Sequence, residues 1–283
     1  MKSINFFFVL TVVFFTGILA YGQNAAINVA TYNLRLDIAS DGENAWPNRK
    51  EKVKELIRYH EFEIMGTQEG FHHQLEYLLE LPGFAYSGVG RDDGEEGGEH
   101  SAIFYKTNRF ELLDNGDFWL SETPHVPSLG WEAQYKRICS WVKLNDKTNK
   151  QEFYVFNAHF DHQAKVAREQ SAILMLKKIK EIAGDAPVIC VGDFNSVPET
   201  VQIQKIKEVF HDAYHITEIP PYGPVGTFNG FKLDAPLKNR IDYIFISPHF
   251  NVEKYGALTD SFEQRFPSDH FPVVARLVFK TNE

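Results

Sequence analysis

A chain of 283 residues, 43% of them hydrophobic, is long enough to bury a large core, and it contains no stretch typical of a linker. Its formal charge of −9, from 29 Lys and Arg against 38 Asp and Glu, argues against the basic face with which proteins hold long nucleic acids. An acidic chain fits a small substrate, or a site in which metal ions offset phosphate charge. One domain of roughly 250 residues fits this length as well as two smaller ones. Without a linker, we expect a single domain over residues 23–283.

The first 22 residues are typical of a secretory signal peptide. Lys2 precedes a short apolar run over residues 4–15, and small residues follow up to Gly22. The alternative is a membrane anchor, but the run is short for a full span and no basic stop follows it. We therefore expect cleavage after Gly22, export to the periplasm or the exterior, and no transmembrane segment in the mature protein.

Five apolar or alternating runs in the first half of the chain predict strands, at residues 26–37, 64–69, 85–89, 101–105 and 110–119. Two helices separate the first three strands. One begins near Pro47 and the other spans residues 71–81. His72 and His73 lie in the second helix, where we expect exposed side chains and not metal ligands.

The second half predicts a hairpin, with strands over 135–144 and 152–158, and then the clearest helix of the chain, over 164–182. The apolar positions of this helix are Val166, Ile173, Leu174, Leu176, Ile179 and Ile182, and Gly184 ends it. The remaining elements are a strand at 188–191, a helix at 199–210, a loop at 218–238, and strands at 240–246 and 271–279. Because strand pairs interrupt the βα alternation, we expect two mixed sheets with helices outside.

Two cysteines, Cys139 and Cys190, lie in apolar strand-like runs. A free cysteine in such a run behaves as a small hydrophobic residue. Export also permits a disulfide between adjacent strands. The sequence leaves both alternatives open.

The stretch from Val188 to Pro198 carries the first functional signal. Its four apolar residues, bounded by Pro187 and Gly192, are typical of a strand buried on both faces. Asp193 and Asn195 follow at once, so they would stand at the rim of a sheet. Gly, Asp and Asn are also turn residues, and a simple turn explains this stretch equally well when it is taken alone.

Six predicted strands begin or end with residues that bind metals or phosphate. These residues are Asn33, Glu69, His159, Asp193 with Asn195, Asp242, and Asp269 with His270. One acid at a strand end often only caps a loop, but six such ends are hard to attribute to solubility. Hard oxygen ligands suit Mg²⁺, Mn²⁺ or Ca²⁺, and the lack of a Cys/His cluster argues against structural zinc.

These residues occur in the order found in the endonuclease/exonuclease/phosphatase superfamily, which the chain resembles from Asn28 to Phe279. No single motif is decisive, but the ordered set is specific. The resemblance implies an α/β fold, a four-layer sandwich of two packed mixed β-sheets flanked by helices. It also implies a divalent metal cofactor and a phosphoester substrate.

The resemblance implies a role for each site residue. Glu69 would be the principal metal ligand, with Asn33 and Asp269 completing the shell directly or through water. His270 would be the catalytic histidine, oriented by Asp242. A simpler explanation stays open for two of them, because Asp242 could only pair with Arg240 or a neighbouring loop amide, and Asn33 could only satisfy backbone groups at a strand end.

The other roles concern water and phosphate. Asp193 and Asn195 would activate or position the attacking water and bind the phosphate. His159 would donate to a phosphate oxygen or protonate the leaving group. Two weaker matches are Arg137, where some members place a phosphate-binding arginine, and Glu99, where some place the acid that supports the histidines. We expect His162 to lie outside the catalytic set, as a supporting or surface residue.

We therefore expect an exported, metal-dependent phosphoesterase acting on a small or surface-displayed phosphodiester or phosphomonoester, such as a sugar, lipid headgroup or nucleotide. The alternative is a secreted Mg²⁺-dependent nuclease. A third reading, a binding protein without activity, is disfavoured because such a protein has no need of both histidines. Specificity is expected in the loops at 91–100, 121–131 and 218–238, and the aromatic candidates for a pocket wall are Trp46, Phe228 and Phe231.

Overall fold

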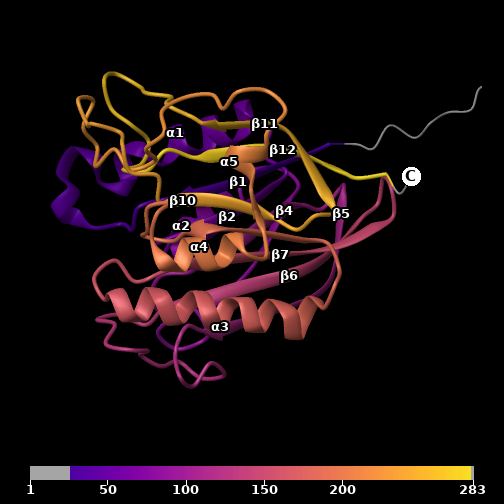
Figure 1. The fold of residues 1–283 in the computed structure, drawn as a ribbon. Helices are drawn as coiled ribbons and strands as arrows, with labels where there is room; N and C mark the ends of the chain where they lie inside the picture. Colours follow the sequence, from indigo (N-terminus) through magenta and orange to yellow (C-terminus); the bar gives the residue numbers. More distant parts are fainter. Residues whose placement is uncertain (1–25, 282–283) are drawn as a thin grey trace, which may run out of the picture.

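Two six-stranded β-sheets pack face to face in the computed structural model of the chain, which describes residues 26–281 (Figure 1). The first sheet contains, in spatial order, β11 (Phe250–Ala257), β12 (Val273–Phe279), β1 (Ile27–Asn33), β2 (Ile64–Gln68), β4 (Ile103–Lys106) and β3 (Phe84–Ser87). The second contains β5 (Phe110–Trp119), β6 (Ile138–Asp146), β7 (Gln151–His159), β8 (Val188–Asp193), β10 (Asp242–Ile246) and β9 (His211–Asp212). The predicted signal peptide, residues 1–22, lies outside the described residues.

Helices cover the outer face of each sheet. The helices α1 (Trp46–Tyr59) and α2 (His72–Leu78) pack on the first sheet, and α3 (Lys165–Ala183) and α4 (Val201–Lys207) pack on the second. A 3₁₀ segment, η1 (Ala39–Asn44), precedes α1, and a short helix, α5 (Ala213–Ile216), follows β9. Each sheet is mixed, since β1 and β2 are parallel in one and β7 and β8 in the other. The predicted four-layer α/β sandwich is therefore confirmed.

The central strand β8 separates two layers of the core. Ile189 and Val191 point into the core between the sheets, whereas Val188 and Cys190 point to the layer under α3 and α4. All four side chains are buried, so the prediction of a strand covered on both faces is confirmed.

The strand directions bring the polar strand ends to one edge of the sandwich. In the parallel pairs, Asn33 at the end of β1 lies beside Gln68, and His159 at the end of β7 lies beside Asp193. The strand β10 runs antiparallel to β8, so its first residue, Asp242, also lies opposite Asp193. The segment before β12 reaches the same edge because β12 runs antiparallel to β1. Residues far apart in sequence thereby meet in one place.

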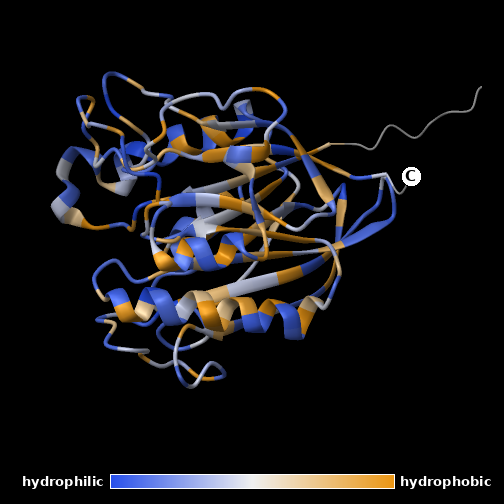
Figure 2. Ribbon diagram, in the orientation of Figure 1, coloured by the Kyte–Doolittle hydropathy of each residue, from blue (hydrophilic) through white to orange (hydrophobic). Residues whose placement is uncertain are grey.

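The predicted inward face of α3 was wrong in part. Val166 and Ile173 are 45% and 44% exposed, although both were assigned to the apolar stripe. The buried positions are Ala167, Ser171, Ala172, Met175, Ile179 and Ala183. Small residues make up most of this face, together with Met175 and Ile179, while the visible side of α3 mixes hydrophobic and hydrophilic residues (Figure 2). The end of the helix at Gly184, with φ of +61°, is as predicted.

The structure adds one long strand, β11, that the sequence did not predict, and it shortens the helix expected at 199–210 to α4. The hairpin of β6 and β7 is confirmed. Cys139 and Cys190 are both free and buried. They lie on β6 and β8, which β7 separates, so the alternative of a disulfide between adjacent strands does not hold. Within residues 26–281, none of the helices is both long enough and apolar enough to span a bilayer.

Candidate active site

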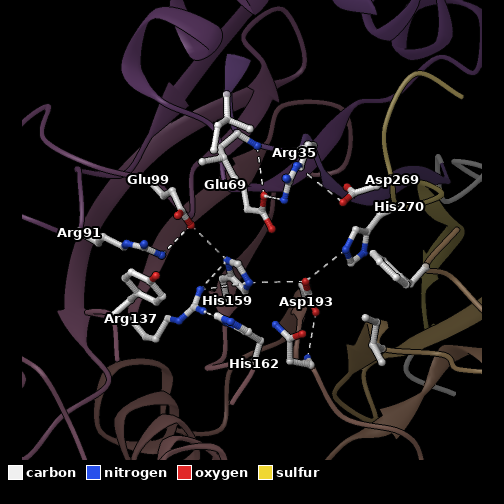
Figure 3. A pocket seen from close by; sticks show the side chains of 16 residues that line it. Arg35, Glu69, Arg91, Glu99, Arg137, His159, His162, Asp193, Asp269 and His270 are labelled. Atoms are coloured by element: carbon white, nitrogen blue, oxygen red, sulfur yellow. Dashed lines mark hydrogen bonds and ion pairs between the residues drawn. The ribbon is translucent and has the colours of Figure 1, made fainter. Parts of the chain in front are cut away.

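One carboxylate oxygen lies within reach of both histidines. Asp193 Oδ2 is 3.6 Å from Nε2 of His159 and 3.8 Å from Nε2 of His270 (Figure 3). On its other side, His270 Nδ1 lies 2.9 Å from Asp242 Oδ2. Since Nδ1–H donates to Asp242, the opposite ring nitrogen is directed toward Asp193.

These contacts favour a charged His270. Burial lowers its pKa, but the carboxylates of Asp242 and Asp193 outweigh burial and hold the pKa well above its ordinary value. Burial, and next the charge of Asp242, raises the pKa of Asp193 to about 7. At neutral pH, His270 is therefore an imidazolium beside a carboxyl group that can gain or lose a proton.

Cationic groups surround the other histidine. Arg137 NH1 lies 3.1 and 3.2 Å from the two ring nitrogens of His159, and Glu99 Oε2 lies 3.7 Å from Nδ1. Arg91 NH1 donates to the same Glu99 oxygen at 2.6 Å. Burial, followed by the charges of Arg137 and Arg91, holds the pKa of His159 well below its ordinary value. His159 is therefore neutral at pH 7, and burial raises the pKa of Glu99 to about 7.

Arg137 is fixed by two further side chains. Its NH2 donates to His162 Nδ1 at 2.9 Å, and its Nε lies 3.6 Å from Asp161 Oδ2. The other oxygen of Asp161 accepts from the backbone N–H groups of Gln163 and Ala164 just before α3. The loop after β7 thus orients the arginine that contacts both His159 and His162.

Glu69 and Asp269 form the acidic side of the site. Asn33 Nδ2 donates to Glu69 Oε1 at 3.0 Å and to Asp193 Oδ2 at 3.1 Å, while its Oδ1 accepts from the backbone N–H of Arg35 at 2.9 Å. Asn33 therefore presents N–H groups to the carboxylates. That orientation fits an indirect role for Asn33 at a metal site better than direct coordination of the metal. The guanidinium of Arg35 lies 3.9 Å from both Glu69 and Asp269.

The donor set fits a divalent cation. Ligand atoms of Glu69, His159 and Asp193 lie within 4.8 Å of one another, and Asp269 adds a carboxylate on the Glu69 side. Burial raises the pKa of Asp269 to about 6, which a neighbouring cation would counteract. Carboxylate oxygens are the donors that Mg²⁺ and Mn²⁺ prefer.

A buried arginine, Arg49 on α1, joins the segments that carry this acidic side. It donates to the carbonyl oxygens of Leu34, Arg35, Asn44 and Pro267 at 2.5 to 3.0 Å. The carbonyls of Leu34 and Arg35 follow β1, that of Asn44 ends η1, and that of Pro267 precedes Ser268-Asp269-His270. The side chain of Ser268 adds a hydrogen bond of 2.6 Å to the carbonyl of Asn33. Asn33 and Asp269 are thereby held in a fixed relation to each other.

The site opens into a pocket of about 540 Å³. Of the residues predicted for the site, Glu69, Glu99, Arg137, His159, Asp193, Asn195, Asp269 and His270 line it. Asn33 and Asp242 lie behind the wall and contact these residues. Of the three aromatic candidates, only Phe228 lines the pocket.

The sequence missed several residues of the pocket wall. Arg35, Arg91 and Tyr135 lie in irregular segments, although Arg35 and Tyr135 were included in the strands predicted at 26–37 and 135–144, which in the structure end at Asn33 and begin at Ile138. The one available signal was their proximity in sequence to predicted residues, since Arg35 follows Asn33 and Arg91 opens the loop that ends near Glu99. His162, expected outside the catalytic set, also lines the pocket.

The fold and this edge of acids and histidines define a class of proteins, the α/β sandwich phosphoester hydrolases. The chain belongs to the Endonuclease/Exonuclease/phosphatase family, whose sequence profile matches residues 30–270. The predicted family is therefore confirmed. Enzymes of this family hydrolyse phosphoesters and depend on divalent metals.

Several known proteins are similar along most of the chain. A family protein of Bacteroides thetaiotaomicron is 46% identical, with a TM-score of 0.88, over 92% of this chain and 100% of that one. A mannosyl-6-phosphatase of Bacteroides thetaiotaomicron VPI-5482 is also 46% identical, with a TM-score of 0.85, over 89% and 100%. An uncharacterised protein of Acanthamoeba polyphaga mimivirus is 26% identical over 251 residues, which cover 81% of this chain and 91% of that protein.

Proposed function

We propose that this protein is an exported, divalent-metal-dependent phosphatase that hydrolyses the phosphomonoester of a small alcohol, in the first place a sugar phosphate. The observation that carries the proposal is the position of Asp193 Oδ2 within 4 Å of both His159 and His270 at the pocket wall. A mannosyl-6-phosphatase that is 46% identical supports the choice of a sugar phosphate. Export is proposed from the sequence of residues 1–22 alone.

The residues divide the chemistry between them. The carboxylate of Asp193, with a pKa of about 7, would accept a proton from the attacking water near neutral pH. The imidazolium of His270 would donate its Nε2–H to the oxygen of the leaving alcohol, which departs as a neutral hydroxyl group, and Asp242 keeps the ring in the orientation that this requires. Neutral His159 would donate to a phosphate oxygen, and Arg137 would stabilise the negative charge.

Glu69 and Asp269 would hold the cation, with Asn33 orienting Glu69. When bound, a divalent cation supplies positive charge to the non-bridging phosphate oxygens. Asn195 supports the reacting carboxylate, because its backbone N–H donates to Asp193 Oδ1 at 2.9 Å. The proposed cofactor is Mg²⁺ or Mn²⁺, with Ca²⁺ as a further candidate.

The test is phosphate release with Mg²⁺, Mn²⁺ or Ca²⁺ from mannose 6-phosphate, a nucleotide, a phospholipid and p-nitrophenyl phosphate. Bis-p-nitrophenyl phosphate and plasmid DNA serve as diester substrates. We expect turnover of mannose 6-phosphate, reduced at least a hundredfold in His270→Ala and in Glu69→Ala. The matched control is His211→Ala, which changes an exposed histidine at the far end of the second sheet.

Two results would overturn this proposal. Plasmid nicking without monoester turnover, abolished in both site variants, would support the nuclease instead. No turnover of any phosphoester, with wild type equal to both variants, would support a binding protein.

A further inference from the structure

The pocket continues past His159 to a wall that the proposed chemistry does not use. Arg91, Tyr135 and His162 form this polar wall (Figure 3 labels Arg91 and His162). The ring of Tyr135 is stacked on the ring of His162, with centroids 6.0 Å apart and planes 20° from parallel. The guanidinium of Arg91 lies 5.5 Å from the centroid of the same tyrosine ring. The three side chains therefore form one continuous surface.

The polar wall is held in place from behind. Arg91 is only 8% exposed, and its carbonyl accepts from Trp119 Nε1 at 2.7 Å. His162 Nδ1 accepts from Arg137 at 2.9 Å, and its Nε2 lies 3.0 Å from the side-chain nitrogen of Gln163, so the ring is held from two sides. Tyr135, in contrast, is 43% exposed. Replacing Tyr135 with phenylalanine would keep the ring and remove only the hydroxyl group.

The wall offers hydrogen bonds without a large net charge. Arg91 is paired with Glu99 at 2.6 Å, so this carboxylate offsets its positive charge when it is ionised. The Nε of Arg91 is buried without a hydrogen-bond partner among the described residues. Compensated donors and acceptors side by side match hydroxyl groups, which donate and accept, better than they match a second phosphate.

The remainder of the pocket wall has apolar residues. Leu36, Ile38, Phe228 and Ile241 line it, and Phe228 is 47% exposed with its ring 5.1 Å from that of His270. A pyranose has hydroxyl groups at its edge and C–H groups on its faces. A pocket lined by both polar and apolar side chains is complementary to such a ring.

We infer that Arg91, Tyr135 and His162 form a subsite for the hydroxyl groups of the leaving alcohol. This subsite selects the phosphate ester of a polyhydroxylated ring over an ester of an alcohol that lacks hydroxyl groups. The inference rests on the proposed phosphatase function. It assigns specificity to residues that are separate from those proposed to react.

The test compares two substrates that share a phosphate and differ in the leaving alcohol, mannose 6-phosphate and p-nitrophenyl phosphate. The quantity measured is the ratio of kcat/KM for the first over the second. Tyr135→Phe and His162→Phe keep an aromatic ring at each position and remove the polar groups. We expect the ratio to fall about tenfold in the double variant, mainly through KM for the sugar ester, because two neutral hydrogen bonds are lost.

Tyr59→Phe is the matched control, since this tyrosine is 80% exposed on α1 and outside the pocket. Thermal melting of each variant checks that the fold is retained. A ratio within twofold of wild type, whether both activities persist or fall together, would overturn the subsite alone. A wild-type protein that hydrolyses neither ester would overturn the proposed function and the subsite with it.

Discussion

The two histidines of the site have opposite charge preferences because of their immediate neighbours. His270 lies against the carboxylates of Asp242 and Asp193, whereas His159 lies against the guanidinium of Arg137. A neutral His159 can donate to a phosphate oxygen but has no proton to spare for a leaving group. Of the two roles that the sequence left open for His159, the first fits these surroundings.

A single substitution tests the role proposed for Asp242. Asp242→Asn removes the carboxylate that raises the pKa of His270, so this pKa should fall toward its ordinary value. If the imidazolium is needed, the alkaline limb of the pH–rate profile moves to lower pH, and kcat falls about a hundredfold. The measurements are a pH–rate profile and the titration of His270 followed by NMR.

The control is Asp260→Asn, which breaks another Asp–His pair, 3.1 Å from His60 on the surface. It should leave both the profile and kcat unchanged. An Asp242→Asn protein with the wild-type profile would remove Asp242 from the mechanism.

Contacts between residues could be predicted from the sequence where both residues lie at the ends of predicted strands, and not elsewhere. Asp242 and His270 were expected to pair, and they lie 2.9 Å apart. The competing pairing of Asp242 with Arg240 was wrong, since Arg240 makes two hydrogen bonds to Asp212, at 2.9 and 2.6 Å. Arg240 lies before β10, which begins at Asp242, so strand alternation does not set its direction, and its guanidinium turns to Asp212 on β9.

At the scale of elements, the two sheets are joined by a polar bridge inside an otherwise apolar layer. Asn157 on β7 donates to the carbonyls of Thr67 and Ala102 in the first sheet, at 2.9 and 2.8 Å. Its Oδ1 accepts from Gln68 at 2.7 Å. The bridge lies two residues before His159, so it also fixes the ends of β2 and β7 relative to each other.

Loss of this bridge should destabilise the protein measurably. Asn157→Ala leaves buried polar groups of Gln68 and Thr67 without their partner, at a cost of roughly 2–4 kcal/mol. Chemical denaturation should show a lower midpoint with an unchanged slope. Asn251→Ala, at an exposed position on β11, is the control and should change stability by less than about 0.5 kcal/mol. A cost below about 1 kcal/mol for Asn157→Ala would show that the sheets do not depend on the bridge.

Elements with strong apolar patterns were predictable, and those defined by tertiary contacts were not. The run from Val188 to Val191 predicted β8 because a short apolar run, mainly of β-branched residues and bounded by Pro187 and Gly192, is typical of a buried strand. The inward face of α3 could not be recognised, because Ala and Ser carry little hydrophobic signal and yet form the contact. The strand β11 alternates poorly, with Glu253, Lys254 and Gly256 inside it, and is defined by its pairing with β12.

At the scale of the whole molecule, the site concentrates buried acid on an already acidic protein. Burial raises the pKa of Glu99 and Asp193 to about 7 and that of Asp269 to about 6, against about 4 in an unfolded chain. The folded state therefore binds these protons more tightly than the unfolded state. The stability that they contribute is complete below about pH 4 and is lost as the pH rises through 6 to 7.

Metal removal should expose this dependence. In EDTA, we expect Tm to fall by several degrees as the pH is raised from 5.5 to 8, because the stability that these groups contribute is lost. Mg²⁺ should raise Tm more at pH 8 than at pH 5.5, because Asp269, a proposed ligand whose pKa is about 6, binds the cation only when it is ionised. Glu99→Gln removes one of the three groups and should flatten the pH dependence in EDTA. An equal effect of Mg²⁺ at both pH values would place the cation away from these carboxylates.

The anchoring of the acidic edge by Arg49 bears on how such a protein diversifies. The hydrogen bonds of this arginine all go to main-chain oxygens, those of Leu34, Arg35, Asn44 and Pro267. A change of the Asn44 side chain removes no acceptor of these hydrogen bonds, whereas Leu34 is also buried in the core and is constrained by packing. The sequences of loops around the pocket can thus change, and substrate preference can change with them, while the reacting groups keep their positions.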